Sequence, residues 1–285
     1  MIVAGIGELL WDILPAGRQI GGAPANFAYH SQVLGAESRI VTAVGDDEAG
    51  REIIAELEEH GLDTTHVAID ENHPTGMVSV RVDWDGMPEY TIHENVAWDF
   101  MSQTPEHLDL ATRVDAVCFG SLAQRSPVSR KTIRSFLRAT RPDCLRIYDV
   151  NLRQAYYDDH LIREALSLAT VLKLNESELA ILAGLLEIDG NTRSLLDSMA
   201  ERFSLTAIAL TRGDRGCIIR TDEQTVENDG FSRDRIVDTV GAGDCFTAVL
   251  TVGLLRDEPL DAIAEQANRL AAHVCSKQGA MPEMP

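Results

Sequence analysis

Lysine is scarce in this 285-residue sequence: three of its 25 basic residues are lysines, and the others are arginines. Acidic residues number 45, which gives a formal net charge of −20 at pH 7. Such a chain lacks the basic footprint with which nucleic-acid-binding proteins neutralise phosphates. We therefore expect no nucleic acid and no anionic membrane surface among its partners.

Long apolar runs and paired cysteines are missing as well. No window of about 18 apolar residues occurs, which argues against a membrane-spanning helix. Residues 1–6 enter a strand-like run directly and lack the basic and small-residue sections of a signal peptide. The five cysteines include no C-x-x-C pair, which fits neither a disulfide framework nor a zinc site. We expect a cytoplasmic protein with reduced cysteines.

The common nucleotide-binding fingerprints are also absent. The sequence has no G-x-x-x-x-G-K-[ST] phosphate loop and no G-x-G-x-x-G motif after a strand. A dinucleotide-binding oxidoreductase is therefore disfavoured. Any nucleotide site in this chain must be of another kind.

Strand-like and helix-like stretches alternate along the chain, which predicts one α/β domain, residues 1–285, with a mostly parallel sheet covered by helices on both faces. Apolar, β-rich runs occur at residues 38–44, 114–119, 145–149, 171–174 and 207–211. Helical periodicity covers residues 25–34, 48–59, 130–141, 160–169, 177–182, 192–203, 242–255 and 260–278.

One region departs from this alternation. Gly76–Val82 and Glu89–His93 carry alternating apolar and polar residues around a turn at residues 85–86. We interpret residues of about 9–20 and 67–95 as a small β-sheet lid inserted into the α/β domain. The alternative is an edge hairpin of the main sheet. Because so small a sheet is not stable alone, we expect the lid to pair with its copy in a homodimer.

The strongest chemical signal is the segment Asp238-Thr-Val-Gly-Ala-Gly-Asp244. Small residues at 241–243 allow backbone amides to converge on one anion. Helical periodicity begins immediately afterwards, which places the loop at the positive end of a helix. Asp244 would then stand near a transferring phosphate and could accept a proton from an attacking hydroxyl. On spacing alone, an ordinary helix cap after a Gly-rich turn explains the segment equally well.

A second Gly-rich segment, Gly21-Gly-Ala-Pro-Ala-Asn26, also leads into a helix. Paired glycines permit close approach of the backbone to a ligand. The side-chain amide of Asn26 both donates and accepts hydrogen bonds, which suits a hydroxyl group. A plain turn before a helix is the alternative.

Together these two segments resemble the two signatures of the PfkB/ribokinase family of carbohydrate kinases. Further motifs follow in the family's order: Asp149-Val-Asn151-Leu-Arg153, Asn175-Glu-Ser-Glu178, Thr211-Arg-Gly213-Asp-Arg-Gly216 and, in the last helix, Asn268. The resemblance covers nearly the whole chain, and Val249 departs from it where Gly or Ala is usual. It implies a ribokinase-like three-layer αβα sandwich with a mostly parallel central sheet and a small β-sheet lid.

The resemblance also implies a role for each matching residue. Asp244 would be the catalytic base, and the amides of Gly241, Ala242 and Gly243 would form its anion hole. The acceptor would be bound by Asp12, Gly22, Asn26, Asn95, Arg125 and Asp238, although Arg125 has the alternative of an ordinary loop arginine. The nucleotide would be bound by Asn175, Thr211, Gly213, Gly216 and Asn268. Glu178 would hold Mg²⁺ through water, and Asp238 and Val240 would border a site for a monovalent cation such as K⁺.

The implied function is transfer of the γ-phosphoryl group of ATP to a hydroxymethyl group of a sugar. The sequence of residues 21–26 and the Gly120-Ser-Leu context favour a fructokinase that acts on D-fructose. Another keto-sugar, a sugar acid or a nucleoside is the alternative acceptor, and a non-catalytic sugar or nucleotide sensor is the alternative class. The predicted lid contains one arginine, Arg81, and no lysine, which disfavours a phosphosugar.

Overall fold

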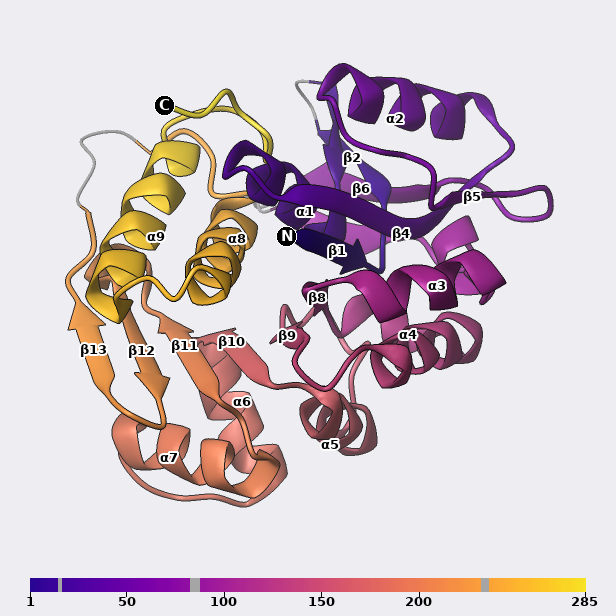
Figure 1. Ribbon diagram of the computed structural model, residues 1–285. Coiled ribbons are helices and arrows are strands. Elements are labelled where there is room, and N and C mark those ends of the chain that lie inside the picture. Colours follow the sequence, from indigo (N-terminus) through magenta and orange to yellow (C-terminus); the bar gives the residue numbers. More distant parts are fainter. Residues whose placement is uncertain (15–16, 83–87, 232–235) are drawn as a thin grey trace.

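The computed structural model describes the chain except for residues 15–16, 83–87 and 232–235, and its largest feature is a sheet of nine strands (Figure 1). In spatial order the strands are β13 (Thr225–Asn228), β12 (Cys217–Thr221), β11 (Ala207–Thr211), β10 (Val171–Asn175), β9 (Leu145–Asp149), β8 (Ala116–Phe119), β1 (Ile2–Ile6), β4 (Glu37–Gly45) and β5 (Val67–Asp70). The pairs β11–β12 and β12–β13 are antiparallel, and the other neighbours are parallel. The prediction of a mostly parallel sheet is confirmed.

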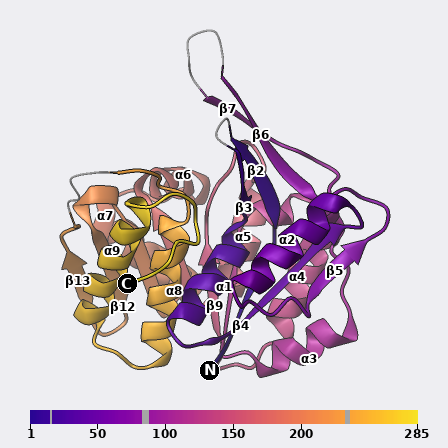
Figure 2. The same cartoon turned by 90° about the horizontal axis from the view of Figure 1, so that it is seen from above.

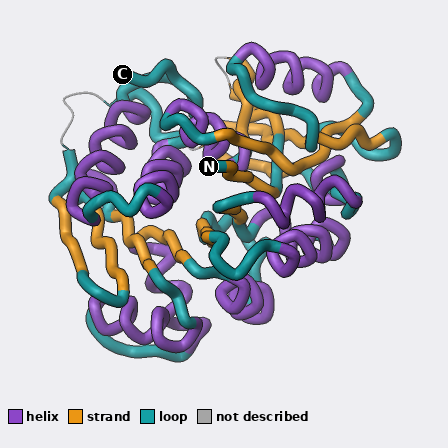
Figure 3. The backbone as a smooth tube through the Cα atoms, in the orientation of Figure 1, coloured by secondary structure: helices purple, strands orange, loops and turns teal. Residues whose placement is uncertain are grey.

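Helices cover both faces of this sheet (Figure 3). One face carries α1 (Ala23–Val33), α2 (Glu48–Glu59), α8 (Ala242–Leu255) and α9 (Leu260–Cys275). The other carries α3 (Pro105–Arg113), α4 (Pro127–Ala139), α5 (Asp159–Leu168), α6 (Glu176–Leu186) and α7 (Thr192–Phe203). Short 3₁₀ helices lie at η1 (Ala97–Phe100), η2 (Leu122–Arg125) and η3 (Gly213–Arg215). The predicted three-layer αβα sandwich is therefore confirmed.

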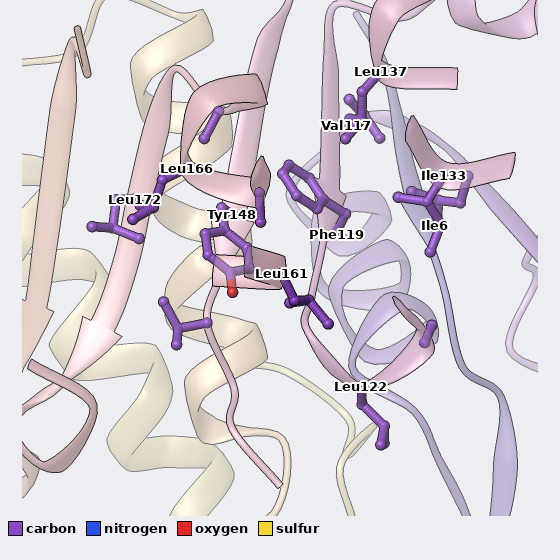
Figure 4. Packing of buried hydrophobic residues seen from close by; sticks show 14 of the residues in the cluster. Ile6, Val117, Phe119, Leu122, Ile133, Leu137, Tyr148, Leu161, Leu166 and Leu172 are labelled. Atoms are coloured by element: carbon purple, nitrogen blue, oxygen red, sulfur yellow. The ribbon is translucent and has the colours of Figure 1, made fainter. Parts of the chain in front are cut away.

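Successive side chains of a strand point to opposite faces of the sheet, so the core is divided between these two helical layers. In β8, Val117 and Phe119 pack in the cluster on the side of α3–α7, whereas Ala116 and Cys118 pack on the side of α8 and α9. Phe119 stacks on Tyr148 of β9, with 5.2 Å between the ring centroids (Figure 4). Strands that are buried on both faces explain the continuous apolar runs in the sequence.

A second sheet of four strands stands apart from the first, and Figure 2 shows its strands β6 and β7 extending beyond the body of the molecule. Its strands, in order, are β3 (Gly17–Gly21), β2 (Leu10–Leu14), β6 (Gly76–Val82) and β7 (Pro88–Ile92). The predicted separate sheet is confirmed, and the alternative of an edge hairpin on the main sheet is wrong. We refer to these four strands as the small sheet.

The small sheet begins later in its second segment than the predicted range of residues 67–95, since its strand β6 starts at Gly76. Residues 67–70 form β5, which pairs in parallel with β4 at the edge of the large sheet, because Val67 is buried there opposite Thr42. The turn predicted at residues 85–86 lies outside the described residues.

Cys118, Cys144, Cys217 and Cys245 are buried thiols that behave as small apolar residues, and Cys275 is half-buried. Among the helices of the described residues, none combines the length and the apolar composition needed to cross a membrane.

The central aromatic pair gives a test of the core. Phe119→Ala should lower the free energy of unfolding by about 3–5 kcal/mol, because it leaves a cavity beside Tyr148. Denaturant-induced unfolding measures this change. Phe231→Ala, at a side chain that is 39% exposed, is the control and should change stability by less than about 0.5 kcal/mol. Equal losses in the two variants would contradict the assignment of Phe119 to the core.

Candidate functional site

A pocket of about 760 Å³ lies between the small sheet and the carboxyl ends of the central parallel strands. The small sheet contributes Leu10, Asp12, Gln19, Gly21, Val78 and Ile92. The strand ends and the segments that follow them contribute Glu8, Leu122, Asn151, Arg153, Gln154 and Lys173. The start of α1, residues 237–241, Gly243, Asp244 and Gln278 complete the wall. This edge is where open α/β sheets bind their ligands.

The predicted anion loop lies on this pocket at the N-terminus of α8. Gly241 is the N-cap residue and has a φ of 78°, a left-handed conformation that favours glycine. A side chain at Gly241 would also lie 2.6 Å from the Cα atom of Ala280, so close packing requires glycine as well. Within the described part of the chain, the amides of Gly243 and Asp244 have no hydrogen-bond acceptor. The helix cap and the amide donors expected of an anion site are thus present in the same loop.

The amide of Ala242 differs from its neighbours. It points into the turn, where it makes a long hydrogen bond of 3.4 Å to the carbonyl oxygen of Thr239. Ala242 is not a lining residue of the pocket. Of the three predicted amide donors, those of Gly241 and Gly243 belong to residues that line the pocket.

Asp244 is the acidic residue of the first turn of α8. Its Oδ2 atom accepts a hydrogen bond of 2.7 Å from the side-chain amide of Asn26. Burial, together with the negative charge of Asp149, raises the pKa of Asp244 to about 6. The bond from Asn26 and the positive charges of Lys173 and Arg153 oppose this rise. A carboxylate of this kind is ionised at neutral pH and basic enough to take a proton there.

A buried ion pair lies behind the loop. The Nζ atom of Lys173 is 3.1 and 3.2 Å from the two carboxylate oxygens of Asp149, and the hydroxyl of Thr247 in α8 donates to Asp149 at 2.8 Å. Burial acts to lower the pKa of Lys173, but the surrounding carboxylates, Asp149 foremost, outweigh it and raise the pKa. A side chain at Gly243 would lie 2.9 Å from the Nζ atom. A charged ammonium group therefore adjoins the anion loop.

The two neighbouring glycines of the first Gly-rich segment face the small sheet. A side chain at Gly21 would lie 2.3 Å from the Oδ2 atom of Asp12, and one at Gly22 would lie 2.5 Å from a backbone oxygen of the β1–β2 connection. Burial raises the pKa of Asp12 to about 6; the charge of Arg153 lowers it, and that of Asp238 raises it further. Asp12 therefore stands in the pocket as a carboxylate with little water around it.

Asp238 ties the anion loop to the segment that follows α9. Its Oδ1 atom accepts a hydrogen bond from the amide of Val240 at 3.0 Å, and its Oδ2 atom accepts one from the amide of Gly279 at 3.2 Å. The amide of Asp238 itself donates to the carbonyl oxygen of Cys275 at 3.3 Å. The conformation of the loop is thus set partly by residues far along the chain.

The same C-terminal segment, residues 276–285, is also fixed to α1. The ring Nε2 of His30 donates to the carbonyl oxygen of Ala280 at 2.9 Å, and the hydroxyl of Tyr29 donates to that of Pro282 at 2.8 Å. Burial lowers the pKa of His30 to about 4, so the ring is neutral at physiological pH and acts as a simple donor. These contacts hold the C-terminal segment against the helix that carries Asn26.

The residues predicted to bind the nucleotide form a row beside the pocket rather than part of its wall. Asn175 pairs with Thr211 across β10 and β11, Thr211 pairs with Cys217, and Cys217 pairs with Asn228. The side-chain amide of Asn268 donates to the Oδ1 atom of Asn228 at 2.8 Å. The row meets the pocket at β10, which also carries Lys173.

The two predicted glycines of this region lie in and after η3. Gly213 and Gly216 both have left-handed φ values, of 64° and 81°. A side chain at Gly216 would lie 2.0 Å from the carbonyl oxygen of Asn228, so the turn closes tightly on β13. Glycine at this position is therefore required for packing, whatever else the turn binds.

Glu178, the predicted metal residue, is engaged by backbone amides. It forms a capping box with Asn175: its Oε2 atom accepts from the amide of Asn175 at 2.8 Å, and its own amide donates to the Asn175 side chain at 3.0 Å. Its Oε1 atom accepts from the amide of Leu152 at 3.0 Å. Glu178 therefore links the loop after β9 to the start of α6. In the described residues, no cluster of three or more His, Cys, Asp or Glu side chains suits a metal ion.

Arg125 and Asn95 do not line the pocket. The guanidinium of Arg125 makes two bonds of 2.8 Å to the carboxylate of Asp99 and lies 4.1 Å from the ring centroid of Trp98. Its side chain is 7% exposed, so contact with an acceptor would require this ion pair to break. Asn95 is exposed and has a φ of 57°, in the segment after β7. Trp98 is fully buried.

Sequence reasoning left several wall residues unassigned, above all Glu8, Lys173 and Arg153. Glu8 and Arg153 follow buried parallel strands, which is the sequence signal that marks the binding edge of such a sheet. Lys173 gave a second signal, because a lysine inside an otherwise apolar strand requires a buried partner. Arg153 was noted within a motif but given no role.

Comparison with known proteins agrees with this geometry. Residues 16–285 match the profile of the pfkB family carbohydrate kinases. A sugar kinase of Pyrococcus horikoshii is 30% identical over 299 residues, which cover 98% of this chain and 91% of that protein. The fructokinase of Escherichia coli is 30% identical over 297 residues, which cover 98% and 95%. Fructokinase-1 of Zea mays is 28% identical over 310 residues, which cover 100% and 94%.

Solved structures show the same fold. The Pyrococcus horikoshii sugar kinase in complex with ATP superposes with a TM-score of 0.82 at 28% identity, covering 99% of this chain and 94% of the other. A fructokinase of Vibrio cholerae, crystallised with fructose, ADP and a potassium ion, gives a TM-score of 0.81 at 21% identity, covering 100% and 94%. At that identity, the second comparison shows the fold alone.

The raised pKa of Asp244 makes a prediction about stability. The pKa of Asp244 in the folded protein, about 6, lies above the ordinary value of 3.8, so protonation of Asp244 stabilises the folded protein. This contribution to stability is lost as the pH rises through about 6. Asp244→Asn cannot ionise, so the variant does not lose stability in this way as the pH rises. Its Tm relative to wild type should therefore increase between about pH 4 and about pH 6 and stay level above about pH 7, as measured by thermal unfolding.

The control for this experiment is Asp189→Asn, at an exposed carboxylate after α6. Its Tm relative to wild type should stay constant over the same pH range. A constant difference for Asp244→Asn as well would show that the carboxylate is not destabilised by burial.

Proposed function

Because the chain belongs to the pfkB family of carbohydrate kinases, we propose that it transfers the γ-phosphoryl group of ATP to a hydroxymethyl group of D-fructose. The chain is a sugar kinase, a phosphotransferase that acts on an alcohol group. The observation that carries the proposal is the position of Asp244: it borders the pocket, is oriented by Asn26, and follows directly on the amide of Gly243.

The pocket's charge supports a neutral acceptor. Its described wall carries four carboxylates, Glu8, Asp12, Asp238 and Asp244, against Arg153 and a lysine already paired with Asp149. Carboxylates accept hydrogen bonds from hydroxyl groups and repel phosphate. Fructose also has the support of the relatives from Escherichia coli and Zea mays, which are named as fructokinases.

In the proposed reaction, a hydroxymethyl group of the sugar lies against the carboxylate of Asp244. As the hydroxyl oxygen attacks the γ-phosphorus, its proton passes to Asp244, and the bond from that phosphorus to the bridging oxygen of ADP breaks. The products are the sugar phosphate, ADP and a proton that Asp244 returns to solvent. The amide of Gly243 and the ammonium of Lys173 face the charge on the transferred group, where each preorganised donor is worth about 3–4 kcal/mol.

Mg²⁺ and K⁺ are part of the proposal. Because both carboxylate oxygens of Glu178 accept backbone amides, Glu178 fits an outer role through water and does not fit direct coordination of Mg²⁺. The ion would then arrive on the phosphates of ATP and neutralise their charge. Asp238 links the anion loop to the C-terminal segment, and a monovalent cation near Asp238 and Val240 would stabilise that link.

An acceptor panel tests the proposed function. ADP release would be measured with Mg²⁺, with and without K⁺, against hexoses, keto-pentoses, sugar acids and nucleosides. D-Fructose should give the highest kcat/KM. A higher value for another acceptor would replace fructose, and ADP release that depends on none of them would favour a sensor on the same fold.

Asp244→Asn tests the proposed base. It should lower kcat by about 10²–10⁴, the contribution of a general base, while ATP still binds. In wild type, kcat/KM should fall about tenfold per pH unit below about pH 6, because protonation of Asp244 removes the acceptor for the hydroxyl proton. Asp189→Asn should leave both quantities unchanged. Near-normal turnover of Asp244→Asn would remove Asp244 from this role.

We also propose that the small sheet pairs with a second copy of the chain in a homodimer, in the cytoplasm. One end of the sheet packs on the body, where the indole of Trp11 donates to the carbonyl oxygen of Ala49 at 3.0 Å. Ile13 of the same strand is 36% exposed. Sedimentation should give a dimer at micromolar concentration, and Ile13→Glu should shift it towards monomer. A strict monomer of the wild type would contradict the pairing. The buried thiols suit a reducing compartment.

A further inference from the structure

Glu8 is a buried acid on the pocket wall that the reaction described above does not use. It lies in the β1–β2 connection, directly after the carboxyl end of β1, and is 3% exposed. Its Oε2 atom is buried and has no hydrogen-bond partner among the described residues. A buried carboxyl oxygen without a partner is costly, and natural proteins keep one only where something else satisfies it.

We propose that Glu8 is a specificity-determining residue that hydrogen-bonds a hydroxyl group of the acceptor, next to the hydroxyl that Asp244 deprotonates. The inference deepens the proposed sugar kinase reaction and rests on it. Glu8 and Asp244 both border the pocket, and the negative charge of Asp244 acts to raise the pKa of Glu8. A sugar presents hydroxyl groups on adjacent carbons, so two neighbouring carboxyl groups match two neighbouring hydroxyls.

The packing around Glu8 explains why it can serve in this way. A side chain at Gly22 would lie 2.5 Å from the carbonyl oxygen of Glu8, so glycine at this position lets the start of α1 approach the β1–β2 connection. The backbone amide of Glu8 itself and that of Ala23, at the start of α1, partly stabilise the ionised carboxylate of Glu8. A helix-capping role alone would leave the Oε2 atom unsatisfied, whereas an acceptor hydroxyl supplies its partner.

The protonation of Glu8 is consistent with hydroxyl recognition. Burial raises the pKa of Glu8 to about 7; Arg153 and the backbone amides lower it, and Asp244 raises it. Near neutral pH the side chain is present in both protonated and ionised forms. It can therefore donate to a hydroxyl oxygen or accept from a hydroxyl hydrogen without placing a second full charge beside Asp244.

Steady-state kinetics of two variants test the proposal. Glu8→Leu should raise the KM for the acceptor about tenfold or more, because the hydroxyl loses its partner, and should leave the KM for ATP within about twofold. Glu8→Gln, whose amide also donates and accepts, should retain most of the acceptor affinity. Glu59→Gln, which removes an exposed carboxylate in α2, is the control and should match wild type.

Deoxy analogues of the acceptor separate direct contact from a structural role. Removing the hydroxyl that Glu8 contacts should reduce kcat/KM in wild type but have little further effect in Glu8→Leu. The proposal is wrong if every deoxy analogue lowers kcat/KM by the same factor in wild type and in Glu8→Leu. It is also wrong if the KM for the acceptor is the same in Glu8→Leu as in wild type. Should Glu8→Leu fail to fold, as judged by thermal unfolding, Glu8→Ser takes its place.

The acceptor for these measurements is whichever compound gives the highest kcat/KM in the panel. A result in which fructose is not the substrate would therefore overturn the choice of sugar and leave the test of Glu8 intact.

Discussion

The buried ion pair between Lys173 and Asp149 is the interaction on which the rest of the site depends. Asp149, the last residue of β9, stands opposite Lys173, the third residue of β10, and Thr247 adds a bond from α8. The pair thereby joins the central strands to the helix that carries the anion loop. Because both charges are buried, removing either one would leave the other without a partner in a poorly solvated place. The same negative charge raises the pKa of Asp244 and makes it a better base.

In the proposed reaction, the carboxyl edge of the large sheet has two halves. The proposed acceptor half is built from the β1–β2 connection, the small sheet and the start of α1. The proposed nucleotide half is the row that runs from Asn175 to Asn228 and ends at Asn268. Lys173 and the anion loop lie where these halves meet. A group transferred from one ligand to the other has to pass this point.

Local sequence patterns were sufficient for much of the fold. The predicted bounds of α2, α7, α8, β9 and β11 coincide with those observed. β12, β13 and α3 were missed: β13 (Thr225–Asn228) has four half-exposed or exposed residues, and α3 has few apolar positions. The edge strand β5 was assigned to the wrong sheet because its partner, β4, is distant in the sequence.

The site was predictable where one short segment contains all of it, as in the anion loop. It was not predictable where contact between two side chains depends on the register in which two strands pair. Lys173 meets Asp149 only because β10 pairs in parallel with β9 in one alignment. Arg125 shows the converse: its position after a strand suggested an acceptor contact, but Asp99 and two aromatic rings enclose it. Whether a charged side chain faces a ligand or a partner depends on tertiary neighbours.

The C-terminal segment has a consequence for synthesis of the protein. Residues 276–285 support Asp238 and pack against Gly241, while α1, which they also contact, is made near the beginning of translation. During synthesis the β1–β2 connection and α1 therefore emerge well before the residues that support the anion loop, so the two sides of the pocket are not completed together.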